Sequence, residues 1–114
     1  ILQNKGKFQG VWASWDGQAW VIDDILRAQG MKKGDVVMVS VDGGQESYRR
    51  IKDPESLFTA TVAIPFETIG EKAVEAMDQI VVKKTPKDKV VNGPYMWVDA
   101  VLVDGSNVDQ FITK

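Results

Sequence analysis

The sequence predicts an α/β fold in which an open, mainly parallel sheet carries helices on both faces. Three observations lead to this fold class. Apolar runs of strand length alternate with segments of helical apolar period, and the connections between them are short. The strand-like runs are apolar throughout, which suits parallel strands that are covered on both sides. The order β-α-β-α-β-α-β-α implies right-handed crossovers between neighbouring strands.

The first half of the chain is predicted to contain two strand–helix units. We expect a helix end with a turn over residues 1–7, followed by a strand over 8–14 and a helix over 16–29. A second strand is expected over 35–41 and a short polar helix over 45–51. The longer helix is supported by apolar residues at helical spacing, namely Ala19, Ile22, Ile25, Leu26 and Ala28. Asp16 is a favourable N-cap for it, and Gly30 a favourable residue just beyond its C-terminus.

The second half is predicted to add two strands and a long helix. Its expected elements are a strand over 58–64 stopped by Pro65, a helix to about Val82, a loop over 83–94, a strand over 95–103, and a short terminal helix capped by Ser106. Thr68 and Glu71 fit a capping box at the start of the long helix, and a start one turn earlier is the alternative. The apolar stripe of that helix consists of Ile69, Ala73, Ala76, Met77 and Ile80.

The composition excludes several classes of protein. The 114 residues suffice for one domain with its own core, and a net charge of −2 favours neither nucleic acid nor an anionic membrane as a partner. The chain has no cysteine and no histidine, which excludes disulfides, thiolate catalysis, imidazole bases and the common zinc sites. No apolar stretch has the length of a transmembrane helix. Because the first residue is Ile rather than Met, we expect a processed or trimmed chain.

Two strand-like runs, VWASWDG at 11–17 and VSVDG at 39–43, both end in Asp-Gly. In parallel α/β sheets, ligands bind beyond the carboxyl ends of the strands, so Trp15, Asp16 and Asp42 are expected at one edge. A carboxylate accepts hydrogen bonds from hydroxyl groups, and an indole offers a flat apolar face. This combination predicts a site for a neutral polyhydroxylated ligand that requires neither metal nor other cofactor.

Each of these residues also has a purely structural interpretation. Asp16 is then only an N-cap, Trp15 a core aromatic, and Asp42 the start of a turn with Gly43. Trp12, inside the first predicted strand, is expected in the core.

Three blocks of the chain resemble the C-terminal part of type I periplasmic sugar-binding proteins, the substrate-capturing subunits of ABC transporters. The blocks are GVWASWDGQAWVIDDILRAQG, DVVMVSVDGG and FTATVAIPFETIGEKAVEAM. The resemblance covers nearly the whole chain, and the closing SNVDQFI is similar to the usual ending of the family. It implies a periplasmic-binding-protein-like fold of which this chain forms part of one lobe.

The resemblance also implies roles for four residues. Asp42 matches an aspartate that binds sugar hydroxyls. Trp15 stands where the family has a ligand-binding asparagine, and Asp16 where it has a helix-capping aspartate. Ile64 stands where the family has a ligand-contacting glutamine at the hinge between the lobes. The indole at position 15 therefore favours stacking, and the polar contact at position 64 is lost.

The family's organisation implies partners for the chain. Residues 1–114 would be the C-terminal portion of a two-lobe protein, and the segment 65–92 would pack on the other lobe. The expected function is that of a periplasmic, non-enzymatic subunit of an ABC importer, which binds a sugar-like ligand between the lobes and delivers it to a permease. Without the other lobe, the apolar stripe of the long helix would be exposed and would favour self-association.

Two other functions are compatible with this fold class. One is the effector-binding domain of a LacI-like transcription regulator, although the chain has Lys33-Gly34-Asp35 and Thr59-Ala60-Thr61 where such regulators usually have other motifs. The other is an enzyme that uses Asp16 and Asp42 as acid and base, for which the sequence offers no phosphate-binding glycine loop.

Overall fold

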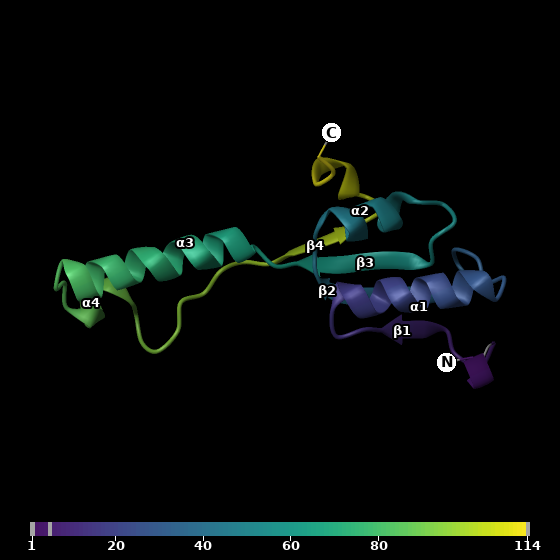
Figure 1. Cartoon of the computed structure of the whole chain (residues 1–114), viewed down its shortest axis with the longest axis horizontal. Helices are drawn as coiled ribbons and strands as arrows, with labels where there is room; N and C mark the ends of the chain where they lie inside the picture. The colour runs from purple at the N-terminus through teal and green to yellow at the C-terminus, as the bar shows by residue number, and fades with distance from the viewer. Residues whose placement is uncertain (1, 5, 114) are drawn as a thin grey trace. The chain divides into compact units, whose positions relative to one another are not determined.

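The computed structural model describes residues 2–4 and 6–113, and the chain divides into two compact units. Unit 1 consists of residues 1–64 and 101–114, and unit 2 of Pro65–Ala100. The elements in chain order are η1 (Leu2–Asn4), β1 (Gly10–Trp12), α1 (Asp16–Ala28), β2 (Val37–Asp42), α2 (Gln45–Lys52), β3 (Phe58–Ala63), α3 (Phe66–Met77), η2 (Asp78–Val82), α4 (Lys87–Val90), β4 (Val101–Asp104) and η3 (Val108–Gln110). Here η1 and η3 are 3₁₀ helices and η2 is a π-helix. Unit 2 contains α3, η2 and α4 (Figure 1).

Unit 1 is built on a four-stranded sheet in the order β1-β2-β3-β4. The first three strands run parallel, and β4 pairs antiparallel with β3, which confirms the α/β class with an open, mainly parallel sheet. The predicted strand over 95–103 is wrong in extent, because β4 begins only at Val101. The predicted strand over 8–14 is likewise shorter. Of the helix end expected over 1–7, the structure shows the turn η1, and residues 1 and 5 lie outside the described residues.

Both crossover helices of unit 1 lie against the same face of the sheet. Asp16, at the start of α1, accepts hydrogen bonds from Ser40 of β2 and from Ser47 of α2, so the two helices meet over the buried side of β2. Parallel strands in sequential order place consecutive right-handed crossovers on one side of the sheet. In the described residues of unit 1, the helices therefore cover one face, where the sequence predicted helices on both.

The opposite face of the sheet is apolar and open. Because side chains alternate across a strand, this face carries Trp12, Val37 and Leu102, which are 69%, 56% and 57% exposed. The prediction that Trp12 belongs to the core is therefore wrong. It lies on the edge strand β1 and on the side that α1 and α2 do not cover.

The C-terminus of α1 has the predicted glycine geometry. Gly30 has a φ of +77°, a conformation that glycine adopts without steric penalty. Its N–H bonds to the Arg27 carbonyl oxygen at 2.8 Å, and the Met31 N–H bonds to the Leu26 carbonyl oxygen at 3.1 Å. These two bonds form a Schellman motif, which ends the helix.

The buried face of α1 differs from the predicted apolar face. Its buried residues are Asp16, Ala19, Asp23 and Leu26, whereas Ile25 is 41% exposed. Two carboxylates thus replace apolar side chains on the face that packs against the sheet. Each must be satisfied by hydrogen bonds, because an unpaired buried charge is strongly unfavourable.

Asp23 joins α1 to α2 and to the start of β3. Its fully buried carboxylate accepts hydrogen bonds from Ser56 Oγ and from the Leu57 N–H, both at 2.8 Å, and from the Arg50 guanidinium at 3.0 Å. Arg50 also donates to Asp24 at 2.7 Å, and this bond holds the pKa of Asp24 below its ordinary value. Burial acts to lower the pKa of Arg50, but its hydrogen bonds to the carboxylates outweigh burial and raise that pKa. The cluster therefore cross-links the two helices.

The C-terminal segment of unit 1 packs along α2. The rings of Phe111 and Tyr48 have centroids 5.6 Å apart, and Gln45 Nε2 donates to the Phe111 carbonyl oxygen at 2.8 Å. The predicted terminal helix forms as η3, with Asn107 rather than Ser106 as its N-cap. The backbone and hydroxyl of Ser106 instead bond to the aspartate that ends β4.

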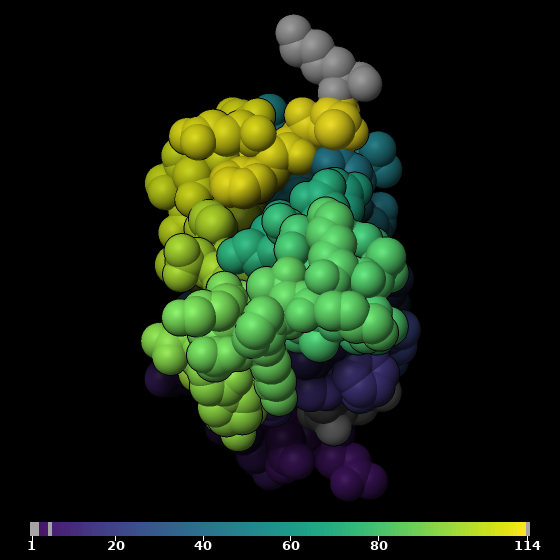
Figure 2. All heavy atoms as spheres, turned by 90° about the vertical axis from the view of Figure 1, so that its left-hand side faces the viewer, coloured from purple at the N-terminus to yellow at the C-terminus, as the bar shows by residue number. Residues whose placement is uncertain are grey.

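Unit 2 is helical and leaves its apolar residues exposed. No residue of α3 or η2 is buried, and Figure 2 shows the atoms of this unit in green. Its exposed apolar side chains include Phe66, Ile69, Val74, Met77, Val81 and Val82. Apolar surface of this extent indicates an interaction site. In the described part of the chain, no helix has the length and apolar character needed to cross a membrane.

The boundaries within unit 2 correct two predictions. α3 begins at Phe66 with Pro65 as N-cap and no side-chain capping bond, so the capping box of Thr68 and Glu71 does not form. The helix starts earlier because Pro65, which has no N–H, ends the strand directly before it. The predicted loop over 83–94 contains the helical turn α4.

Candidate functional site

The carboxyl ends of β2 and β3 meet at one edge of the sheet. Asp42 is the last residue of β2, and its carbonyl oxygen accepts a hydrogen bond at 2.8 Å from the N–H of Ile64, which directly follows β3. The N–H of Gly43 donates to Asp16 Oδ2 at 3.0 Å. The structure thus brings together Asp16, Asp42 and Ile64, and Trp15 precedes Asp16 in the chain.

Asp42 combines a strained backbone with an unpaired carboxylate. Its φ of 139° is one that residues with a side chain rarely adopt, and such strain is concentrated at functional sites. The residue is half-buried, and within the described residues its carboxylate has no hydrogen-bond or ion-pair partner. Two acceptor oxygens therefore remain for a ligand at this edge.

Gly43 allows the chain to turn tightly against β3 and α2. Its φ is +85°, and a Cβ at this position would lie 2.7 Å from the Tyr48 hydroxyl and 2.8 Å from the Ala63 Cα. Only glycine combines this backbone conformation with so close an approach. The turn that follows Asp42 is consequently held in one conformation by packing.

Asp16 is a buried polar centre rather than the predicted N-cap. Trp15 is the N-cap of α1 and makes no side-chain capping bond, while Asp16 is 2% exposed and faces the sheet. The Asp16 carboxylate accepts hydrogen bonds from Ser40, Ser47, Thr61 and the Gly43 N–H. It is directed toward the sheet and α2 because these donors satisfy it better than the first turn of its own helix. Direct binding of a ligand by Asp16 stays a prediction.

Trp15 is a surface residue, so its interpretation as a core aromatic is wrong. Its side chain is 50% exposed, and its indole lies against Gly17, where an added Cβ would come within 3.1 Å of Trp15 Nε1. Together with Gln18, Val21 and Ile22 it lines a shallow groove along α1. Its stacking on a ligand stays a prediction.

Three hydroxyl residues that bond to Asp16 were not predicted from the sequence. Ser40, Ser47 and Thr61 are all buried, and Ser47 also accepts a hydrogen bond from Trp20 Nε1 at 3.0 Å. Ser40 and Thr61 stand between apolar residues inside the mainly apolar strands VMVSVD and FTATVA. A polar side chain in such a run must find a buried partner, and this signal was present in the sequence.

The Asp42 carboxylate offers two acceptor oxygens that no described residue occupies. No cation pairs with Asp42 in the described part of the structure, and the described residues contain no group of acidic side chains that could hold a metal ion. A carboxylate can accept hydrogen bonds from hydroxyl groups. Such bonds are stronger than those in which the acceptor is uncharged. The arrangement suits recognition of hydroxyl donors.

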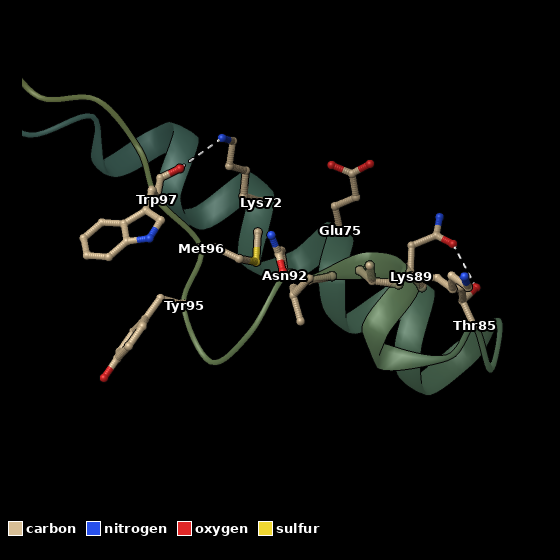
Figure 3. A pocket seen from close by; sticks show the side chains of 12 residues that line it. Lys72, Glu75, Thr85, Lys89, Asn92, Tyr95, Met96 and Trp97 are labelled. Carbon is tan, nitrogen blue, oxygen red and sulfur yellow. Dashed lines mark hydrogen bonds between the residues drawn. The ribbon is translucent and has the colours of Figure 1, made fainter.

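Unit 2 has a hollow of its own, with a volume of about 630 Å³, between α3 and the segment after α4 (Figure 3). Lys72 donates to the Trp97 carbonyl oxygen at 3.5 Å across it. The rings of Tyr95 and Trp97 have centroids 5.8 Å apart and are 66% and 83% exposed, and Figure 3 shows the Tyr95 ring pointing away from α3. None of the predicted site residues lines this hollow.

Comparison with known proteins gives matches among solved structures. No protein-family model and no curated protein sequence matches the chain. The crystal structure of an ABC transporter solute binding protein from Agrobacterium vitis with bound allitol matches with a TM-score of 0.74 and 24% identity, over 90% of this chain and 33% of that one. The crystal structure of an ABC sugar transporter subunit from Rhodobacter sphaeroides 2.4.1 matches with a TM-score of 0.71 and 28% identity, over 87% of this chain and 32% of that one.

These matches confirm the predicted structural resemblance to type I periplasmic sugar-binding proteins. The chain has their fold over nearly its whole length, and it spans about a third of the length of each of the two proteins. Both are transport proteins by their names.

Proposed function

We propose that this chain is part of a solute-binding protein of an ABC importer and contributes one side of a site for a sugar or a similar polyhydroxylated molecule. In this proposal, residues 1–114 form the C-terminal portion of a two-lobe protein, and the ligand binds between the lobes. Capture follows from closure of the lobes around the ligand.

The single observation that carries the proposal is the carboxylate of Asp42. It ends a parallel strand at the edge where α/β sheets bind ligands, and it has no partner within the described residues. Leaving a half-buried carboxylate without a partner is unfavourable unless a ligand or water completes its hydrogen bonds. A hydroxyl-rich ligand supplies two donors to the two oxygens.

The remaining predicted residues define the character of the site. Ile64 lies beside Asp42 through its backbone bond and adds no polar side chain. Trp15 offers a half-exposed indole, whose flat face suits the C–H side of a sugar or polyol. The structural neighbour from Agrobacterium vitis holds allitol, a molecule of this chemical class. We therefore expect a neutral ligand with hydroxyl groups along one edge and carbon-bound hydrogens on the other.

The open surfaces are where the rest of the protein would pack. The segment 65–92 includes the exposed apolar residues of α3 and η2, and we propose that this segment packs on the other lobe. The uncovered face of the sheet around Trp12 and Leu102 is likewise proposed to be covered by elements of the same lobe.

The isolated 114-residue chain is expected to self-associate through these surfaces, because within the described residues nothing covers the exposed apolar side chains of unit 2. Light scattering should give a mean mass that rises with concentration. Substituting Val74→Lys and Met77→Lys, at positions 71% and 61% exposed, should shift the mass toward the monomer without loss of helical signal. A monomer at high concentration in the unmodified chain would contradict the expectation.

The partners follow from the proposed role. The ligand-loaded protein would dock on the permease of the importer and would act outside the cytoplasmic membrane, in the periplasm. It would bind its solute without transforming it, so no enzymatic activity is expected. The effector-binding domain of a transcription regulator is not favoured by the structural neighbours, both of which are named as transport proteins.

The proposal is tested in the complete protein that contains this chain. Its thermal stability is measured against a panel of sugars and alditols that includes allitol, and then its affinity for the most stabilising compound is measured by calorimetry. Asp42→Ala is expected to lower that affinity at least about tenfold, since hydrogen bonds to a charged group contribute about 1.5–3 kcal/mol each. Equal stabilisation of the variant and the unmodified protein would show that Asp42 has no binding role.

Asp104→Ala is the matched control. Asp104 also ends a strand, but it pairs with Ala60 in the middle of β3, whereas Asp42 pairs with Ala63 at the C-terminal end of β3. Loss of its bond to Ser106 should alter only the local turn, so the affinity should remain that of the unmodified protein.

A further inference from the structure

The Asp16 carboxylate accepts four hydrogen bonds, all from groups of the protein. One of the four donors is the N–H of Gly43, the first residue of the turn that follows Asp42. We infer that Asp16 is a positioning residue, which sets the affinity for the ligand by holding the backbone of Asp42 in its strained conformation. This inference rests on the proposed binding role of Asp42.

One peptide unit connects the two aspartates. The C=O of Asp42 and the N–H of Gly43 belong to the same peptide group. The C=O accepts from the Ile64 N–H at 2.8 Å, and the N–H donates to Asp16 Oδ2 at 3.0 Å. With both ends of the group bonded, the peptide plane cannot rotate, and this fixes the backbone on the C-terminal side of Asp42.

The bonded peptide group fixes ψ of Asp42 and φ of Gly43, the two torsions that flank it, and so holds one half of the strained Asp42 backbone. A φ of 139° is unfavourable for a residue with a Cβ and persists only where the surroundings impose it. Loss of the acceptor at Asp16 would let the peptide rotate and the Asp42 side chain move away from its bound position. The affinity would then fall although the Asp42 carboxylate is still present.

Asp16 is itself held in place from three elements. Oδ1 accepts from Ser40 of β2, and it also accepts from Thr61 of β3 at 2.7 Å, while Oδ2 accepts from Ser47 of α2. Trp20 Nε1 donates to the Ser47 hydroxyl at 3.0 Å, which directs the hydroxyl proton toward Asp16. Every neighbour of the carboxylate is therefore a donor. An asparagine would place an amide NH₂ against one of these donors and would lose an acceptor.

The chain supplies a matched control about two turns further along α1. Asp23 is also fully buried, and it also accepts from a serine hydroxyl, Ser56 Oγ, and from a backbone N–H, that of Leu57. It lies beside the start of β3, whereas Asp16 lies beside the carboxyl ends of the strands. Asp16→Asn and Asp23→Asn are therefore expected to destabilise the fold in a similar way, but only the former disturbs Asp42.

The experiment compares Asp16→Asn, Asp23→Asn and Asp42→Ala in the complete protein. Urea unfolding gives the stability of each variant, and calorimetry with the best compound of the sugar and alditol panel gives the affinity under conditions where each is folded. Asp16→Asn should lower the affinity about tenfold or more, the scale at which hydrogen-bond partners of metal ligands act in metal sites. Asp23→Asn should change the affinity less than about twofold while losing comparable stability.

The outcomes separate this inference from the proposed function. If Asp42→Ala lowers the affinity and Asp16→Asn does not, the positioning role of Asp16 is overturned and the proposed function stands. If neither changes it, the proposed role of Asp42 fails, and the inference fails with it. If Asp16→Asn does not fold, Thr61→Val and Ser56→Ala replace the pair, since each removes one hydroxyl donor from one buried carboxylate. Weaker binding by Thr61→Val alone supports the inference, and equal affinities overturn it.

Discussion

Replacing Gly43 with alanine is expected to lower the free energy of unfolding by about 2–5 kcal/mol. Two effects add at this position. A φ of +85° is unfavourable for alanine by about 1–2 kcal/mol, and the new Cβ would lie 2.8 Å from the Ala63 Cα, which is backbone and cannot move aside. Relieving that overlap requires the turn to shift, and overpacking of this kind costs about 1–3 kcal/mol.

The same substitution should weaken ligand binding, because Gly43 shares its peptide group with Asp42. Urea unfolding and calorimetry of the complete protein measure the two effects. Gly30→Ala is the matched control, since Gly30 has a similar φ of +77° but a Cβ added there would meet nothing within 4 Å. It should lose only the conformational part and keep the affinity. Equal losses of stability in the two variants would show that the close approach to Ala63 is unimportant.

Replacing Asp23 with alanine is expected to have the other large effect, a loss of about 3–5 kcal/mol of stability. The Asp23 carboxylate is fully buried and accepts three hydrogen bonds, from Arg50, Ser56 and the Leu57 N–H. Its removal leaves a buried backbone N–H and a buried hydroxyl without that acceptor, and it takes one carboxylate from a partly buried arginine. The midpoint of urea unfolding should fall accordingly.

Asp24→Ala provides the comparison, because Asp24 is the next residue of α1 and bonds to the same arginine. Its side chain is 58% exposed, and exposed ion pairs contribute only about 0–1 kcal/mol. A small loss at Asp24 beside a large loss at Asp23 is the expected pattern. Similar losses at the two positions would mean that burial does not determine the contribution of the carboxylate.

The site could be predicted only in part. Asp16 and Asp42 were expected at one edge of the sheet, because the carboxyl ends of parallel strands meet wherever such a sheet forms, and the structure brings them together there. The role of Asp16 was not predicted, since a good N-cap residue at a helix start has the same sequence pattern whether it bonds to its own helix or to a neighbouring strand. Its true partners lie 24, 31 and 45 residues away in the chain.

The burial of aromatic and apolar side chains was also only partly predictable. Trp12 and Ile25 have the composition and spacing of core residues, yet both are exposed. Hydrophobic spacing predicts which side chains share one face of a strand or helix. It does not predict on which side of the sheet the helices pack. That side follows from the strand order, which local sequence does not contain.

The sequence by itself determined the alternation of strands and helices, the Schellman end of α1 at Gly30 and the Asp-Gly turn after β2, because each depends on residues that are neighbours in the chain. Only the tertiary structure decided that β4 runs antiparallel, that one sheet face stays open and that Asp16 bonds to the Gly43 N–H in the turn after Asp42. Those features arise from contacts between residues far apart in sequence, whose free energy depends on the packed arrangement of whole elements.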